Sequence, residues 1–178
     1  ALNALILLGY VSLHQGDSIG VQFFGYTNKW FAPVKGGKSI NTLLNSVFDV
    51  QSGPEPSDYI VAAESFLTYQ RKRSLVMLVT NSREQTSEIP LALRLLSKHH
   101  LTLLVNLRDS VIDEIPRRNI ETYDDALLLS ERAHFLQDRR RLFRQCAESC
   151  HLSIDCRPQD LIVRLLNAYW LIKRSGAL

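Results

Sequence analysis

Two apolar runs separated by a helical segment constrain the fold of this chain more than any other feature. Residues 74–80 read Ser-Leu-Val-Met-Leu-Val-Thr, and residues 101–107 read Leu-Thr-Leu-Leu-Val-Asn-Leu. A strand that is apolar on both faces has to be covered on both faces, which is typical of parallel strands in α/β proteins. Between the runs, Leu91, Leu95 and Leu96 recur at helical spacing. This segment is therefore expected to be the crossover helix that two parallel strands require.

The rest of the chain alternates between strand-like and helix-like periods in the same way. Further strands are predicted at 19–24, 29–34 and 152–156, and helices at 1–15, 39–50, 58–69, 122–147 and 159–174. Pro33 cannot donate to a ladder, and only a short turn separates its strand from the one before. We therefore expect the 29–34 strand at a sheet edge, antiparallel to its neighbour. The sequence predicts one α/β domain over residues 1–178, with a three-layer, mostly parallel sheet and helices on both faces.

Composition excludes several classes of protein. The 178 residues, 46% of them hydrophobic, suffice for one domain with a sizeable core. Residues 1–100 carry 9 basic and 7 acidic side chains, and residues 101–178 carry 12 and 11. Because this even spread leaves no basic tail or stripe, we do not expect a nucleic acid partner. The longest apolar stretch, around residues 5–8, is far shorter than the roughly 20 residues of a membrane span.

The first residues and the cysteines bear on cellular location. The chain begins with Ala1 inside an apolar helical pattern, without a charged leader and cleavage site, and we interpret it as a fragment that lacks its start. An odd number of cysteines without such a leader favours free thiols in a reducing, cytoplasmic compartment. The cysteines, with a histidine beside them, are Cys146, Cys150, His151 and Cys156. Their spacing is poor for zinc, so we predict reduced, metal-free structural thiols, with a metal cluster as the alternative.

One motif resembles a phosphate-binding loop. Residues 32–39 read Ala-Pro-Val-Lys-Gly-Gly-Lys-Ser, in which Lys38 and Ser39 would contact phosphate and magnesium. The preceding strand contains Pro33, and the apolar run that ends at Thr80 leads into Asn81 rather than an aspartate. We therefore favour a turn that leads into a helix capped by Ser39, and keep a nucleotide-binding enzyme as an alternative.

The remaining polar groups have structural explanations. Residues 16–20 read Gly-Asp-Ser-Ile-Gly, but they lie between a predicted helix and a predicted strand, whereas the Gly-x-Ser-x-Gly elbow of a nucleophilic serine lies between a strand and a helix. His99 and His100 end a helix, and the carboxylate pairs at 113–114 and 124–125 lie near predicted helix starts, where each complements the helix dipole. The arginines at 139–141 and 144 are interpreted as a solvated helix face, with an acidic partner as the alternative. No catalytic residue and no cofactor is predicted.

Five segments, taken in order, resemble those of a known family. They are residues 16–20 with Phe23, residues 36–40, residues 73–81, residues 100–109, and residues 167–173 closed by Gly176 and Leu178. Their order and spacing resemble the von Willebrand factor A domain, and more specifically the bacterial family called domain of unknown function fifty-eight. The resemblance covers nearly the whole chain and implies that the domain's first strand, which lies mid-sheet, is missing here. Residues 19–24 and 74–80 would then pair directly or leave a gap.

The resemblance also implies a function. Related domains hold magnesium with an Asp-x-Ser-x-Ser motif after the first strand, a Thr in the second loop and an Asp in the third. Here that motif is absent, Lys38 or Ser39 takes the place of the Thr, and Asn81 takes the place of the Asp. Magnesium prefers charged oxygen ligands, so this member is expected to be metal-degenerate. A metal-dependent ligand-binding domain in the intact parent is the alternative.

Members of this family commonly carry upstream membrane spans and are encoded beside MoxR-type AAA ATPases. The resemblance therefore implies a non-catalytic interaction or scaffold module at the cytoplasmic face of the membrane, with such an ATPase as a partner. The expected partner-contact loops, free of metal, contain Lys38, Ser39, Asn81, Ser82 and Arg83. We expect these two loops to approach each other, and an inert rim left from a lost site is the alternative.

Overall fold

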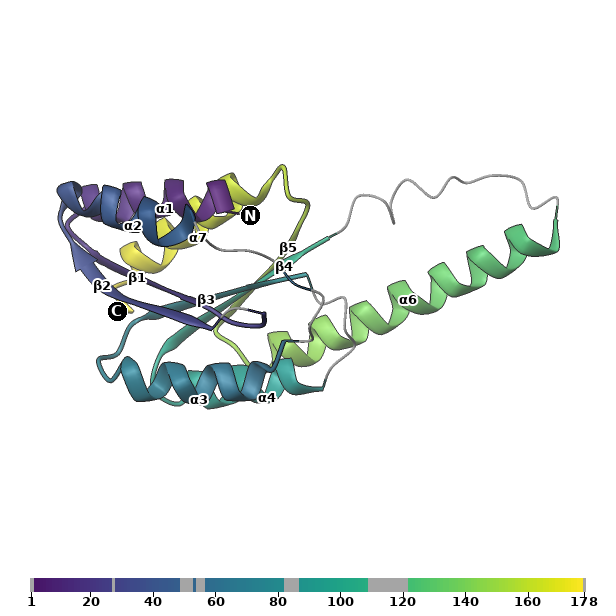
Figure 1. Ribbon diagram of the computed structural model, residues 1–178. Helices are drawn as coiled ribbons and strands as arrows, with labels where there is room; N and C mark the ends of the chain where they lie inside the picture. Colours follow the sequence, from purple (N-terminus) through teal and green to yellow (C-terminus); the bar gives the residue numbers. More distant parts are fainter. Residues whose placement is uncertain are drawn as a thin grey trace. The chain divides into compact units, whose positions relative to one another are not determined.

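The computed structural model describes residues 2–26, 28–48, 53, 57–81, 87–108 and 122–177 (Figure 1). These residues form two compact units. The terminal unit comprises residues 1–72 and 159–178, and the central unit comprises residues 73–158. Each unit has its own sheet.

The central unit contains the parallel sheet. Its strands β3 (Leu75–Thr80), β4 (Leu101–Leu107) and β5 (Leu152–Cys156) are ordered β3-β4-β5, with both pairings parallel. The middle strand β4 is the most buried, and its first six residues are all buried. Helices α4 (Glu88–Ser97) and α6 (Tyr123–Ala147) pack on this sheet and against each other. The α/β class, with a parallel sheet flanked by helices, is confirmed.

Helix α6 is much longer than the strands that it covers. Thr122 and Asp125 form a capping box at its start: each side chain accepts a hydrogen bond from the other's backbone N–H. At 1.5 Å per residue the helix spans about 37 Å, against about 23 Å for the seven residues of β4. Only its C-terminal half buries side chains fully, at Arg139, Leu142 and Cys146. Figure 1 shows the other half extending past the sheet.

The terminal unit contains an antiparallel hairpin covered by helices. Its elements are α1 (Leu2–His14), β1 (Ser18–Phe23), β2 (Lys29–Lys35), the 3-10 turn η1 (Gly37–Ser39), α2 (Ile40–Phe48), α3 (Tyr59–Tyr69) and α7 (Leu161–Ser175). Strands β1 and β2 pair antiparallel, as the short turn between them predicts. Gly20 is needed in β1, because a Cβ there would lie 2.9 Å from the carbonyl oxygen of Phe31. Helix α1 packs against β1, α2 and α7, and the Asp58 side chain caps α3.

The expectation of a single sheet is corrected by the structure. Strands β1 and β2 form a two-stranded sheet of their own, and across the described residues no ladder joins β1 to β3. A hairpin closes a loop of a few residues, whereas β1 and β3 are more than fifty residues apart in the chain and belong to different units. Of the two alternatives given for residues 19–24 and 74–80, a direct pairing and a gap, the described ladders contain no direct pairing.

Candidate functional site

The carboxyl ends of the three parallel strands meet at one edge, which we call the carboxyl edge. Thr80 of β3, Asn106 of β4 and Asp155 of β5 lie in register across it. Asn81 and Arg108 follow directly on β3 and β4, and the Arg108 N–H extends the ladder by donating to the carbonyl oxygen of Cys156 (2.8 Å). In open α/β sheets, ligands bind outside this edge.

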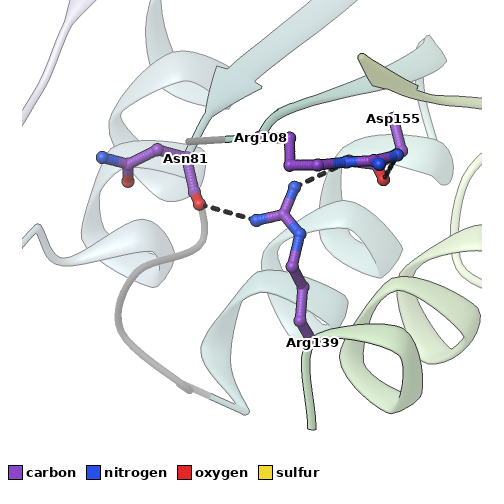
Figure 2. A network of polar contacts seen from close by, with 4 residues as sticks. All are labelled: Asn81, Arg108, Arg139 and Asp155. Carbon is purple, nitrogen blue, oxygen red and sulfur yellow. Dashed lines mark hydrogen bonds and ion pairs between the residues drawn. The ribbon is translucent and has the colours of Figure 1, made fainter. Parts of the chain in front are cut away.

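A buried arginine joins two of the strand ends, and a second arginine links the third to them (Figure 2). Arg139, 8% exposed, reaches from α6 and donates from Nη2 to Asp155 Oδ1 (2.6 Å) and from Nη1 to the carbonyl oxygen of Asn81 (3.1 Å). Arg108 Nη2 donates to the other carboxylate oxygen of Asp155 (3.0 Å). Each oxygen of Asp155 therefore has its own guanidinium. A charge as buried as that of Arg139 requires such a partner, because removing it from water without one is costly.

Asn106 adds an unsatisfied group to the same edge. Asn106 is 1% exposed, and its Oδ1 atom has no hydrogen-bond partner among the residues that the structure describes. It pairs in register with Thr80 on one side and with Asp155 on the other. Because buried acceptors in folded proteins nearly always receive a hydrogen bond, a water molecule or a polar group of a ligand is expected to donate one to Asn106 Oδ1.

Beside Asp155 the surface is hollowed over α6. We call this hollow, about 620 Å³ in volume, the arginine pocket. Its described lining includes one carboxylate, Asp155, and two apolar side chains, Leu136 and Phe143. Five arginines complete it: Arg108, Arg132, Arg139, Arg140 and Arg144. The lining is therefore strongly basic, although the chain as a whole has a net charge of only +3.

The arginines of the pocket differ in what holds them. Arg108 and Arg139 are fixed by Asp155. Arg140 and Arg144 are exposed, and within the part of the chain that the structure describes neither forms a salt bridge. Arg144 Nε donates to the carbonyl oxygen of Arg140 (3.4 Å), so its terminal nitrogens remain available. The pocket thus combines fixed and available guanidiniums.

The predicted partner-contact residues are divided between the two units. Lys38 and Ser39 lie in η1 of the terminal unit, and Asn81 lies at the end of β3 in the central unit. The Ser39 hydroxyl donates to the carbonyl oxygen of Lys35 (2.9 Å) and so closes the turn back onto β2. Ser82, Arg83 and the side chain of Lys38 lie outside the described part of the chain, so the approach of the two loops stays a prediction.

The sequence-based interpretation missed Arg108, Arg139 and Asp155. Arg139 was expected on a solvated helix face, and this is wrong because its side chain is buried and paired. A signal for it exists in the spacing of six half-buried or buried α6 positions, which follow one another by three and four residues: Leu129, Arg132, Leu136, Arg139, Phe143 and Cys146. Arg139 thus lies in the stripe of α6 that faces the unit's interior.

The cysteines are free thiols with restricted access to solvent. Cys146 and Cys156 are buried as predicted, whereas Cys150 is half-buried and its Sγ donates to the carbonyl oxygen of Leu152 (3.2 Å). Burial raises the pKa of Cys146 to about 12, and burial also raises the pKa of Cys150. Across the described residues no group of three His, Cys, Asp or Glu side chains could hold a metal ion. That the thiols bind no zinc stays a prediction.

The fold and this edge define an α/β protein with a basic pocket at the carboxyl edge of a parallel sheet. The model of the family described as protein of unknown function DUF58 matches residues 1–144, more than half of the chain, so the chain belongs to that family. Asn81, Arg108 and Arg139 fall inside the matched range, and Asp155 falls outside it. No curated protein matches the chain. None of the described helices is long and apolar enough to cross a membrane.

Proposed function

We propose that the chain is a non-catalytic protein-interaction module that binds its partner at the carboxyl edge of the central unit. One observation carries this proposal: Asp155, the one carboxylate in the described lining of the arginine pocket, is engaged by two guanidiniums. An acid–base pair or a nucleophile needs a group that is available to give or take a proton or to attack. Arginine stays protonated and supplies neither, but it is well suited to recognition.

The class of partner follows from the family resemblance. The order of segments that resembles the von Willebrand factor A domain, together with membership of the DUF58 family, supports a MoxR-type AAA ATPase as the partner. The interaction would take place at the cytoplasmic face of the membrane.

The alternative of a metal-dependent site finds less support at this edge. Asn81 offers its carbonyl oxygen to Arg139, and both oxygens of Asp155 are already hydrogen-bonded to arginines. A magnesium ion would have to displace or approach the guanidinium of Arg139, at a cost in charge repulsion. Arg139 thus supplies a fixed positive charge between the two strand ends.

The phosphate-loop alternative finds less support as well. In a phosphate loop, a buried parallel strand leads into a loop whose N–H groups surround the phosphate. Here the strand before η1 is β2, an antiparallel hairpin strand, and the Ser39 hydroxyl is engaged with Lys35.

A binding experiment tests the proposed function. The purified chain is immobilised and titrated with a purified MoxR-type ATPase, once with magnesium and once with a chelator. We expect the same dissociation constant in both, because no metal takes part. Abolition of binding by the chelator would favour the metal-dependent alternative, provided that the ATPase alone is shown to keep its assembly under the same conditions.

Two measurements on the chain alone separate the remaining alternatives. Calorimetric titration with magnesium is expected to show no binding tighter than about millimolar, for the wild type and for Asn81→Asp alike. ATP is expected to leave the melting temperature unchanged, whereas a true nucleotide site would add about 2.7 kcal/mol of stability at a hundred times its Kd. Tight magnesium binding or ATP-dependent stabilisation would overturn the non-catalytic, metal-free proposal.

A further inference from the structure

We propose that the arginine pocket binds an acidic peptide segment of the partner, with aspartate or glutamate side chains on Arg140 and Arg144 and an apolar side chain against Leu136 and Phe143. This inference rests on the proposed function and names the chemistry that its site recognises. It follows from four features of the pocket: which arginines are available, what fixes the others, which apolar groups lie between them, and where the positive charge ends.

The available arginines supply the ion pairs. Arg140 and Arg144 are four residues apart on α6, so their side chains lie one above the other on the same face. Both are exposed, and both line the pocket. A guanidinium presents a planar fork of donors that matches the two oxygens of a carboxylate. Two such forks one helical turn apart fit two carboxylates on a single peptide.

The fixed arginines shape the other side of the pocket. Asp155 holds Arg108 at 3.0 Å and Arg139 at 2.6 Å, so these guanidiniums are oriented before any ligand arrives. An oriented donor loses little side-chain entropy on binding, which is the usual cost of a surface ion pair. Asp155 is therefore a positioning residue for this pocket.

The apolar lining argues for a peptide rather than a small inorganic anion. Leu136 and Phe143 are half-buried and line the pocket together with Arg140 and Arg144. A phosphate or sulfate ion would leave these two side chains uncovered, whereas a leucine or phenylalanine beside the acidic residues would bury them. The volume, about 620 Å³, is that of a site for several side chains rather than for one ion.

The limited extent of the positive charge argues against nucleic acid. The neighbouring hollow on α6 is lined by Asp138 and Glu148 as well as by Arg141. A nucleic acid backbone carries a charge at every step and needs a continuous basic track. Here the basic surface is one pocket bordered by carboxylates.

Fluorescence anisotropy tests this proposal with a labelled short peptide that alternates glutamate pairs with leucine. The comparison peptide has glutamine in place of every glutamate. The variants are Arg140→Ala with Arg144→Ala, and the matched control is Arg141→Ala, which removes an exposed arginine of the same helix outside the pocket lining. All three positions are exposed, so the variants are expected to keep the wild-type circular dichroism spectrum and melting temperature.

We expect the glutamate peptide to bind the full chain, and the glutamine peptide to bind at least about tenfold more weakly. The double variant should lose about tenfold in affinity, and Arg141→Ala should bind like the wild type. Raising the salt concentration should weaken binding of the wild type more than that of the double variant.

Several outcomes would overturn the proposal. Equal loss in Arg141→Ala and in the double variant would mean that only net charge matters. Displacement of the peptide by inorganic phosphate at lower concentration than by unlabelled peptide would make the pocket a small-anion site, and tighter binding of a single-stranded oligonucleotide would make it a nucleic acid site.

If a MoxR-type ATPase binds wild type and double variant equally, the pocket proposal fails while the proposed function stands. If the peptide binds at the pocket and the ATPase does not bind at all, the choice of partner fails while the pocket proposal stands.

Discussion

The two sheets of this protein are held by different means. The central sheet is parallel, and its middle strand β4 is buried along nearly its whole length. The hairpin of the terminal unit is antiparallel, half-buried, and packed through aromatic side chains: Trp30 lies 5.6 Å from Phe66 and 5.5 Å from Tyr69, measured between ring centroids. A local hairpin tolerates partial exposure because neighbouring residues pair, whereas a parallel sheet forms only if its crossover helices cover it.

Each unit also has one polar cluster, and the two clusters differ in burial. In the central unit, Arg139 is 8% exposed and connects two strand ends. In the terminal unit, Lys173 of α7 donates to Asp17 (2.8 Å) and to the Tyr169 hydroxyl (3.2 Å), and that hydroxyl donates to Asp17. The cluster of the central unit has little solvent to replace a lost partner, whereas the Asp17 and Lys173 side chains, 40% and 30% exposed, have water beside them. The difference predicts large effects from the first and small effects from the second.

The largest expected effect concerns thiol reactivity in the central unit. With the pKa of Cys146 raised by burial to about 12, its thiolate is about a thousandfold scarcer at mildly alkaline pH than that of an ordinary cysteine. We expect Cys146 to react with a disulfide reagent only when the central unit opens. Denaturant should expose three reactive thiols, and stoichiometric zinc in the purified protein would contradict the prediction of free thiols.

The same chain allows the two units to be followed separately. All three cysteines lie in the central unit, and both tryptophans, Trp30 and Trp170, lie in the terminal unit. If residues 1–178 form a single domain, as the sequence predicts, thiol exposure and the change in tryptophan fluorescence should coincide in urea. Two separate transitions would mean two domains.

The next largest effect is expected in the core of the central sheet. Leu103 on β4 is fully buried, and Leu103→Ala should lower the free energy of unfolding by about 3 to 4 kcal/mol. Val34 on β2 is half-buried, and Val34→Ala should cost about 1 kcal/mol. Urea unfolding followed by circular dichroism measures both values, and equal costs would contradict the contrast between the sheets.

Removal of Arg139 tests the buried polar cluster. Arg139→Ala should lower the free energy of unfolding by about 3 kcal/mol, because Asp155 would lose one of its two guanidiniums and the Asn81 carbonyl would lose its donor. Arg140→Ala, one residue along the same helix, should change it by less than about 0.5 kcal/mol. Thermal unfolding of the two variants side by side gives the comparison, and a neutral Arg139→Ala would mean that the network is not structural.

A smaller effect is expected in the terminal unit. Tyr169→Phe keeps the buried ring of α7 and removes only the hydroxyl that bonds to Asp17 and Lys173. We expect a loss of about 1 kcal/mol, the usual contribution of one hydrogen bond. Tyr169→Ala would also remove the ring and serves as the contrast, with a much larger loss in the same urea experiment.

The smallest effect is the pH dependence of this half-exposed cluster. Burial raises the pKa of Asp17, but hydrogen bonds from Lys173 and Tyr169 outweigh it, so the pKa is lowered from 3.8. The hydrogen bond to Asp17 raises the pKa of Lys173 above 10.5. The ionised Asp17 therefore stabilises the fold above about pH 3.8, and this stabilisation is lost as the pH falls through the folded-state pKa of Asp17. The protonated Lys173 stabilises the fold below about pH 10.5, and this stabilisation is lost as the pH rises through the folded-state pKa of Lys173.

This dependence is measured as the difference in stability between wild type and Asp17→Asn. The difference should be constant near neutral pH and shrink in acid. A difference that grows in acid would mean that the sign of the Asp17 shift is wrong.

Local sequence patterns predicted the helices and strands well, but they predicted contacts between residues distant in the chain less well. The run at 101–107 predicted β4 because five of its seven residues are apolar, and the helix predicted at 58–69 matches α3, whose cap by Asp58 is a local interaction. The pairing of Arg139 with Asp155 depends on how α6 lies over β5, which no spacing within a single element reveals. For the same reason, neither the separation of the two sheets nor the arginine pocket was predicted.

The terminal unit is assembled from two stretches of chain that are more than eighty residues apart in sequence, and this sets an order for its completion during synthesis. The ribosome releases residues 73–158 before α7, so the parallel sheet has its whole chain available first. Until residues 161–175 emerge, α1 lacks α7, the helix that packs against it and carries the buried side chains of Leu165 and Tyr169. A nascent chain stalled before α7 therefore exposes the face of α1 that α7 covers, and the emergence of α7 determines when α1 is protected from aggregation.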